Sequence, residues 1–275
     1  MTGTGDRWRT RLLGVWSVLA LAYLFVPILV IALFSFNDNQ GRFNFTWQGF
    51  TLRHWGDPFA VEGLGEALRN SLFIGVVSTA VAVVLGTLMA IALVRHRFRG
   101  RGTVDSLVFL PLATPEVVLG AALLGLFLTM ATPRGFLTIV IAHVMFILGY
   151  VVVTVKARLE GMDLHVEEAA MDLGANEWAT LRKITIPLIM PGIVAASLLG
   201  FALSLDDFVI TTFNAGQTST FPLFIFGASR QGVPPQVNVL ATGLLLVVLG
   251  LMALNLVVQR RLGRADRGAL PASGR

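Results

Sequence analysis

The most informative part of this chain is a polar stretch near its middle, which reads Glu167-Glu168-Ala169-Ala170-Met171-Asp172-Leu173-Gly174 and runs on to Ile184-Thr185-Ile186-Pro187. Long apolar runs precede and follow it, so the stretch is a charged loop between two membrane spans. A loop of this kind, with apolar and aromatic residues flanked by charge, suits insertion into a groove on a soluble partner.

The composition excludes an ordinary soluble domain. Of the 275 residues, 55% are hydrophobic and only 13% are charged. The net charge of +5 does not indicate nucleic-acid binding, because the basic residues form short clusters beside apolar runs, where they orient membrane proteins. The first apolar run is too long for a signal peptide and has no small-residue cleavage site after it, so we expect a retained span.

Six apolar segments are long enough to cross the bilayer. They are Leu12–Phe34, Ser71–Val94, Ser106–Met130, Phe136–Val155, Ile193–Phe213 and Val237–Val258. At a rise of about 1.5 Å per residue, each covers the hydrocarbon core of about 30 Å. Because backbone groups in lipid must be bonded within the segment, the fold class is all-α: a polytopic membrane protein of six helices, with residues 1–275 forming one transmembrane domain.

The basic residues orient these segments. Most Lys and Arg residues lie on one side, in clusters at 7–11, 95–101, 156–183 and 260–275. The other side has only Arg42, Arg53, Arg69, Arg134 and Arg230. The positive-inside rule therefore predicts that both termini are cytoplasmic, together with the loop 157–190.

Local signals predict a short helix in the first half of this loop. Asp163 is expected to cap it, which places Glu167 and Glu168 near the positive end of the helix. Gly174 is expected to adopt the left-handed conformation that ends it.

A second short helix is expected after Asn176, which can cap it. This helix would carry Trp178, Leu181 and Ile184, and Pro187 is expected to limit its continuation. The alternative is an amphipathic loop lying on the lipid headgroups. The six acids of the region disfavour it, because the membrane surface is itself anionic.

Three acids lie inside the predicted spans, where charge is costly. Glu116 falls near mid-bilayer in the third segment, and Pro111 and Pro115 should kink or break that helix. Asp206 and Asp207 are adjacent in the fifth segment, so only one of them is expected to face a conduit squarely.

No Lys or Arg within the six segments can pair with these acids. They are protonated and pack helices together, or a partner subunit neutralises them, or a cationic substrate does so in passing. His143 in the fourth segment is expected to make an interhelical hydrogen bond rather than to bind a ligand.

Sequence signatures of an enzyme are absent. The chain has no G-x-x-x-x-G-K-[ST] phosphate loop, no H-E-x-x-H, no G-x-S-x-G and no cysteine. We therefore expect no catalytic residue, no metal site and no cofactor in this chain.

The spacing Glu-Ala-Ala, three residues, Gly, nine residues, Ile-x-Ile-Pro resembles the docking loop of ABC importer permeases. Over roughly Pro27 to Val258, the chain resembles the membrane subunits of bacterial spermidine/putrescine ABC importers. Further shared elements are Trp47-Gln48-Gly49-Phe50, Arg97-Phe98-Arg99-Gly100, Pro115-Glu116, Ser204-Leu205-Asp206-Asp207 and the run from Gly232 to Asn238.

The resemblance implies a type I ABC importer permease fold in the bacterial inner membrane. Its partners would be two ATPase subunits that bind ATP and Mg, a second homologous permease and an extracytoplasmic substrate-binding protein. The implied substrate-pathway residues are Trp55, Glu116, Ser204, Asp206 and Asp207. The implied ATPase-coupling residues are Glu167, Glu168, Ala169, Ala170, Gly174, Ile184 and Pro187.

The implied function is import of a cationic solute, a polyamine above all, by alternating access driven by a separate ATPase. Two rival functions remain open. One is an importer for another solute, such as an amino acid, an opine or a metal ion. The other is a proton-coupled secondary transporter that uses the intramembrane acids as a relay, although such a carrier has no need of the docking loop.

Overall fold

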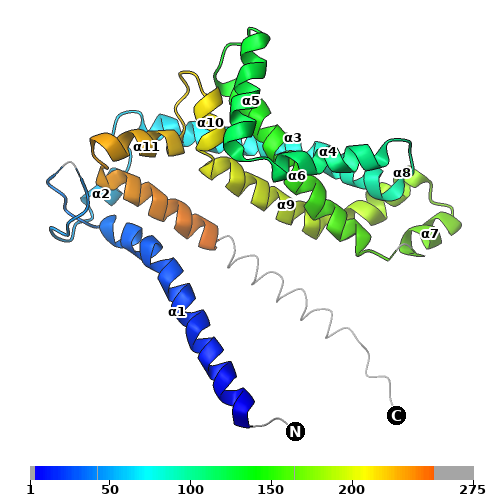
Figure 1. Cartoon of the computed structure of the whole chain (residues 1–275), viewed down its shortest axis with the longest axis horizontal. Helices are drawn as coiled ribbons and strands as arrows, with labels where there is room; N and C mark the ends of the chain where they lie inside the picture. The colour runs from blue at the N-terminus through cyan, green and yellow to red at the C-terminus, as the bar shows by residue number, and fades with distance from the viewer. Residues whose placement is uncertain (1–3, 42, 164, 251–275) are drawn as a thin grey trace. The chain divides into compact units, whose positions relative to one another are not determined.

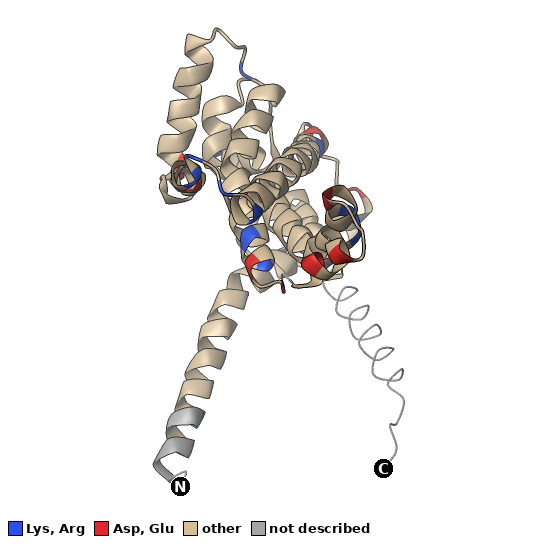
Figure 2. Cartoon of the chain, turned by 90° about the vertical axis from the view of Figure 1, so that its right-hand side faces the viewer, with Lys and Arg blue, Asp and Glu red and all other residues tan. Residues whose placement is uncertain are grey.

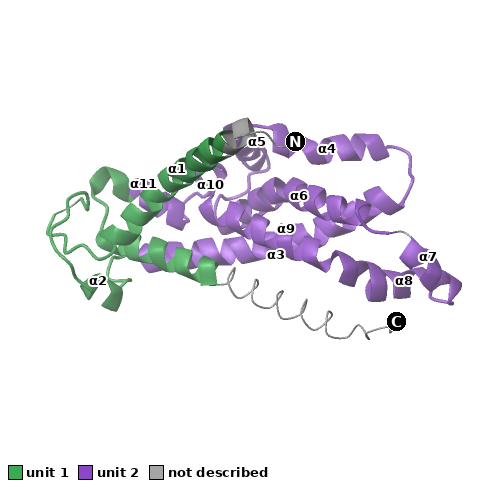
Figure 3. Ribbon diagram, turned by 90° about the horizontal axis from the view of Figure 1, so that it is seen from below, with its two compact units in different colours: residues 1–62, 228–275 green, residues 63–227 purple. Residues whose placement is uncertain are grey.

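The computed structural model describes residues 4–41, 43–163 and 165–250, and this part of the chain is helical, with no strand. It forms two compact units, which are described separately (Figure 3). The terminal unit joins the residues up to Glu62 with those from Ala228 onward, and the central unit is Gly63–Gly227. The expected single transmembrane domain stays a prediction.

The terminal unit contains α1 (Thr4–Phe34), the short α2 (Arg53–Gly56) and an apolar helix, Pro235–Gly250. The loop after α1 is ordered by side-chain amides: Asn37 Nδ2 donates to Asn44 Oδ1 at 2.7 Å, and the Gln48 N–H donates to Asn37 Oδ1 at 2.7 Å. Helix α11 (Phe221–Gln231) begins in the central unit and ends in the terminal one.

The central unit is built on three long helices that run alongside one another: α3 (Leu64–Arg95), α6 (Phe136–Glu160) and α9 (Ile186–Asp206) (Figure 1). Glycines allow them to approach closely. A Cβ at Gly86 of α3 would lie 2.7 Å from Val151 of α6, and one at Gly200 of α9 would lie 2.7 Å from Ile147. Small residues are expected at such contacts, because in lipid helices associate through close packing rather than hydrophobic burial.

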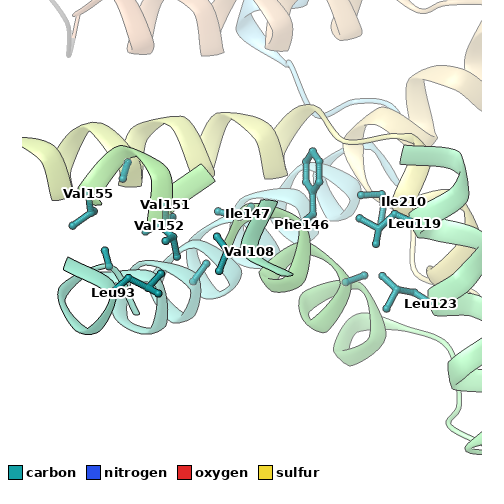
Figure 4. Close-up of a cluster of buried hydrophobic side chains, with 14 of the residues drawn as sticks. Leu93, Val108, Leu119, Leu123, Phe146, Ile147, Val151, Val152, Val155 and Ile210 are labelled. Atoms are coloured by element: carbon teal, nitrogen blue, oxygen red, sulfur yellow. The ribbon is translucent and has the colours of Figure 1, made fainter. Parts of the chain in front are cut away.

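Two shorter helices, α4 (Arg101–Ala113) and α5 (Glu116–Thr129), cover parts of this bundle. The apolar core continues from Leu93, Val152 and Val108 to Leu119 and Leu123 of α5 (Figure 4). The remaining elements are α7 (His165–Asp172), α8 (Glu177–Thr180), the π turn η1 (Leu181–Thr185) and α10 (Val209–Asn214).

Four continuous helices of the described chain are long and apolar enough to span a membrane, namely Arg11–Phe34, Leu64–Arg95, Phe136–Glu160 and Glu177–Asp206. They correspond to the first, second, fourth and fifth predicted segments; the second and fourth are longer than predicted, and the fifth has different bounds at both ends. The sixth segment, 237–258, is described only as far as Gly250, within the helix Pro235–Gly250. Residues 251–258 and the basic cluster beyond them lie outside the described residues.

The third predicted segment, 106–130, is not one continuous helix. It is divided into α4 and α5, which meet at 109°. The predicted break is therefore present at Thr114–Pro115, whereas α4 continues through Pro111 without a break. Proline disfavours the helical conformation of the residue before it, and Thr114 is extended, with ψ of 130°.

The fifth predicted segment, 193–213, has wrong bounds. The helix begins earlier, at Glu177, and ends at Asp206. Asp207 is extended, with ψ of 119°, and α10 begins two residues later. The apolar composition of the segment continues across this break, which is why hydropathy alone did not locate it.

Candidate functional site

The first half of the docking loop folds as predicted. The Asp163 carboxylate accepts a hydrogen bond from the His165 N–H at 3.0 Å, at the start of α7. The helix is followed by Gly174, whose φ is 90°, and the N–H of Ala175 donates to the carbonyl oxygen of Ala170 at 3.0 Å. Glycine adopts this conformation without strain, so it ends the helix sharply.

The second half differs from the prediction. Asn176 caps α8 as expected, since its Oδ1 accepts from the Ala179 N–H at 2.8 Å. The prediction that Pro187 limits the helix is wrong, because α8, η1 and α9 form one continuous helix from Glu177 to Asp206. The π turn η1 ends just before Pro187, the second residue of α9, so the proline lies where the hydrogen-bonding pattern of the continuous helix changes.

Charged residues gather on α7, α8 and the neighbouring helix ends, the side that faces the viewer in Figure 2. Among them, the two adjacent glutamates of α7 have different surroundings. Glu167 Oε1 accepts from Arg95 Nη2 at 3.0 Å and from Thr185 Oγ1 at 2.6 Å. Glu168 is exposed and lies 3.2 Å from His165 on the same helix. Glu167 therefore faces the bundle, and Glu168 faces away from it.

The loop also presents apolar side chains. Leu173 is 90% exposed and Trp178 is 68% exposed. Ala169 is exposed, whereas Ala170 and Ile184 are half-buried. A pocket of about 500 Å³ lies between α7, α8 and the end of α3, and Arg95, Glu167 and Trp178 are among the residues that line it. Exposed apolar residues beside charged ones are typical of a docking surface.

Among the intramembrane acids, Glu116 is the first residue of α5 and is exposed at the break between α4 and α5. Placed in the first turn, its carboxylate is stabilised by the positive end of the helix dipole. Helix α5 packs against α10, where Asn214 Nδ2 donates to the Gly120 carbonyl oxygen at 3.4 Å.

Asp207 is buried, and both of its carboxylate oxygens accept hydrogen bonds. Its Oδ2 accepts from the N–H of Thr211 at 2.8 Å and from the Thr211 hydroxyl at 2.7 Å, so it caps α10. The same oxygen lies 3.2 Å from His143 Nε2. His143 is thus an interhelical hydrogen-bonding residue, as its position in the fourth segment predicted.

The second ring nitrogen of His143 extends this network across the bundle. Its Nδ1 lies 2.6 Å from Ser204 Oγ of α9, which is 3.2 Å from Ser78 Oγ of α3. All four helices that meet here are joined by buried hydroxyl, imidazole and carboxylate groups. Ser204 and Asp207 are therefore held within the protein, whereas Asp206, the last residue of α9, is exposed.

Trp55 belongs to the terminal unit, and the other four predicted pathway residues belong to the central unit. Its ring stacks on Phe36, with 5.3 Å between centroids, and its Nε1 donates to Ser35 Oγ at 3.3 Å. One face and the N–H of the indole are thus committed to the segment that follows α1.

Sequence reasoning missed Arg95 and Thr185, the two partners of Glu167, because they lie 72 and 18 residues away from it. The position of Arg95 at the end of the second span was the one available signal. Within the described residues, no group of three or more His, Asp or Glu side chains could hold a metal ion.

Comparison with known proteins identifies the family of this chain. Residues 82–267 match the family described as binding-protein-dependent transport system inner membrane component. The spermidine/putrescine transport system permease protein PotC of Escherichia coli K12 is 39% identical over 248 residues, which cover 90% of this chain and 93% of PotC. The putrescine transport system permease protein PotI of the same strain is 37% identical, with 95% and 96% covered.

Solved structures share the fold at low sequence identity. A bacterial ABC transporter involved in the import of the acidic polysaccharide alginate aligns with a TM-score of 0.64 and 17% identity, covering 94% of this chain and 98% of that one. A bacterial alginate ABC transporter in complex with an alginate pentasaccharide-bound periplasmic protein aligns with a TM-score of 0.62 and 16% identity, covering 90% and 93%. The chain therefore belongs to the family of binding-protein-dependent transport system inner membrane components, and it is a multi-pass permease of the ABC importer type.

Proposed function

We propose that this chain is a permease subunit of an ATP-driven importer of polyamines, with spermidine and putrescine as the substrate class. The observation that carries the proposal is the 39% identity to a spermidine/putrescine permease protein over 90% of the chain. The intramembrane carboxylates support it independently, because a chain with three acids and no Lys or Arg in its spans suits a cation and not an anion.

Asp206 and Glu116 are the two carboxylates that we assign to the cation pathway. Both are exposed, and both lie at helix ends, where the chain breaks. Asp206 is the last residue of a 21-residue helix, so the negative end of the helix dipole adds to its own charge. An alkylammonium group would be attracted by both contributions. The discontinuous helices fit as well, since irregular backbone at membrane depth is tolerated where it lines a cavity.

Asp207 and Ser204 receive a different role in this proposal. Both are buried in the hydrogen-bond network of His143, so they position the α9–α10 break and with it Asp206. For Trp55, in the terminal unit, the pathway role stays a prediction from the resemblance, by which its aromatic ring would attract a cation through a cation–π interaction.

The transport cycle that we propose is alternating access. Both termini and the loop 157–190 would be cytoplasmic, where the exposed residues Glu168, Ala169, Leu173 and Trp178 meet an ATPase dimer. A second homologous permease and an extracytoplasmic binding protein would complete the assembly. The neighbouring alginate transporter, solved with a periplasmic protein, supports this kind of partner. ATP would be hydrolysed by the ATPase subunits.

The test is uptake by reconstituted vesicles. The permease, co-purified with its ATPase, second permease and binding protein, is placed in liposomes with ATP inside or outside, and uptake of labelled putrescine and spermidine is measured. We expect uptake that needs ATP and survives a protonophore. Uptake driven by a proton gradient without the ATPase would instead identify a secondary transporter. Uptake of another solute, with no competition by polyamines, would overturn the substrate assignment.

A further inference from the structure

Apart from its chain connections to α6 and α8, helix α7 is held to other helices of the central unit by the hydrogen bonds of one side chain, Glu167. No residue of α7 is buried, so packing holds it weakly. In the described part of the chain, Glu167 is the α7 side chain that is hydrogen-bonded to other helices, and it contacts two of them. Arg95 is the last residue of α3, and Thr185 is the last residue of η1.

These contacts are shielded from solvent. The side chains of Arg95 and Glu167 are only 15% and 13% exposed, and Thr185 is buried. Ion pairs on an open surface contribute little, but charge-assisted hydrogen bonds in a partly buried site are stronger and less screened by salt. Helix α7 is therefore held by few contacts, but these contacts are strong because they are shielded from solvent.

The π turn gives Thr185 its place in this contact. The N–H of Ile186 donates to the carbonyl oxygen of Leu181, five residues back, so the turn holds one residue more than an α-helical turn. The Thr185 hydroxyl donates to Glu167 from the last position of this wide turn. Single π turns within α-helices occur frequently at functional sites.

The two helices that Glu167 joins are long. Helix α3 crosses the central unit, and the helix that contains Thr185 continues through α9 to Asp206. The 21 residues of α9 extend over about 30 Å. A displacement of α7 that is carried by Glu167 therefore reaches the carboxylate at the opposite end of the bundle.

We propose that Glu167, held by Arg95 and Thr185, is the mechanical link that transmits movement of α7 to the transmembrane helices. This inference rests on the proposed function, in which an ATPase moves α7. Glu167 is a positioning residue: Glu168 and the exposed apolar side chains meet the partner, and Glu167 passes the movement on to α3 and α9. The contacts of Glu167 with Arg95 and Thr185 are called the brace below.

The first experiment separates coupling from assembly. Glu167→Ala, Arg95→Gln and Thr185→Val are each reconstituted with the partner subunits, and uptake and ATP hydrolysis are measured together. We expect the ATPase to remain bound and to hydrolyse ATP, while uptake per ATP falls roughly tenfold for the first two variants, as for a typical coupling free energy between sites. Thr185→Val should give a smaller loss, because the ion pair remains.

Rescue is the readout that a merely structural role would not produce. The charge-swapped variant with both Arg95→Glu and Glu167→Arg should regain most of the uptake per ATP that either single change removes. Glu160→Gln is the matched control, since Glu160 is an exposed acid at the end of α6 that makes no ion pair within the described residues, and it should behave as wild type. Wild-type uptake per ATP in Glu167→Ala, or no rescue by the swap, would overturn the inference.

A second measurement tests the brace in the permease alone. Because the chain has no cysteine, Asp172→Cys on the exposed side of α7 accepts a spin label at one position. We expect the spin label to be less mobile in the otherwise wild-type protein than in the Arg95→Gln or Thr185→Val variant. Equal mobility in all backgrounds would refute the brace whatever the transport assays show. Absence of ATP-dependent uptake in the wild type, with the mobility difference present, would refute the proposed function and leave the brace standing.

Discussion

Asp206 and Asp207 are neighbours in the chain, yet their carboxylates have opposite environments. Asp207 is buried and accepts three hydrogen bonds from Thr211 and Ile210, besides its contact with His143. Asp206 is exposed. An extended residue between two helices turns adjacent side chains to different sides, so Asp207 supports the fold and Asp206 stays exposed. In the proposed function, Asp206 is the one that meets the substrate.

Substitution should separate these two roles. Asp207→Ala should lower the stability of the purified protein by about 0.5–2 kcal/mol, because a helix cap is lost. Asp207→Asn should cost less, since asparagine also caps. Asp206→Asn should leave the thermal unfolding midpoint unchanged and reduce polyamine uptake. The prediction fails if Asp206→Asn destabilises the protein as much as Asp207→Ala, or if it transports at the wild-type rate.

His54, in the short helix α2, should make the stability of the segment between α1 and α3 depend on pH. Its Nδ1 lies 3.4 Å from Gln236 Nε2. Burial, and then the nearby charge of Arg53, lower the pKa of His54. As the pH decreases, the unfolded segment takes up a proton at His54 before the folded one does. The contribution of neutral His54 to the free energy of unfolding is therefore fully present above about pH 6.5, the ordinary histidine pKa, and is lost as the pH decreases toward the lowered pKa of the folded protein.

The check is thermal unfolding of the wild type and of His54→Gln on both sides of about pH 6.5. We expect acidification to lower the wild-type midpoint more than that of the variant, because glutamine does not titrate. Equal sensitivity of the two proteins would show that other groups cause the effect.

At the scale of elements, close approach of α3 and α6 depends on glycine. A Cβ at Gly86 would lie 2.7 Å from Val151 Cγ1 and 2.9 Å from Val151 Cβ. Such a contact requires the two helices to separate or Val151 to shift. The same helices hold Ser78 and His143, so their spacing also determines the geometry of the buried hydrogen-bond network.

Gly86→Ala should destabilise the purified permease by about 1–3 kcal/mol through overpacking. Adding Val151→Ala should restore part of the stability by making room for the new methyl group. Gly125→Ala is the matched control, because nothing lies within 4 Å of its added Cβ. Thermal unfolding in detergent gives the comparison. Equal midpoints for Gly86→Ala and Gly125→Ala would mean that the helices are not in tight contact.

For the whole molecule, the exposed apolar surface of the docking loop should control assembly. Leu173 and Trp178 project from the loop beside charged residues, a combination that suits a groove on a partner. This role is distinct from that of the brace, which links the loop to the bundle. Substitutions of Leu173 and Trp178 should therefore reduce ATPase binding, whereas substitutions in the brace should reduce uptake per ATP while the ATPase stays bound.

Leu173→Ser and Trp178→Ala should reduce the amount of ATPase that co-purifies, by roughly tenfold or more if they are central contacts. Leu107→Ala removes an equally apolar, exposed side chain from α4 and should leave co-purification unchanged. Full co-purification of the ATPase with Leu173→Ser and Trp178→Ala combined would contradict a docking role for this surface.

Features of this protein that depend on neighbouring residues could be predicted from the chain alone. Hydropathy identified the apolar segments, Pro115 marked the break in the third, and Gly174 and Asn176 marked a helix end and a helix start, because capping and proline geometry involve only neighbouring residues. Prediction from the chain was wrong at Pro187, where the helix continues through a π turn and the proline, and at Asp207, where the helix ends inside an apolar run.

Which of two adjacent acids is buried and which is exposed depends on how the helices pack. Glu167 turns inward because Arg95 and Thr185 are there to receive it, and Asp207 is buried because His143 and Thr211 satisfy its oxygens. A buried carboxylate requires partners, and partners such as Arg95 and His143 come from helices more than sixty residues away. Such pairings depend on how helices pack, which no local pattern in the chain records.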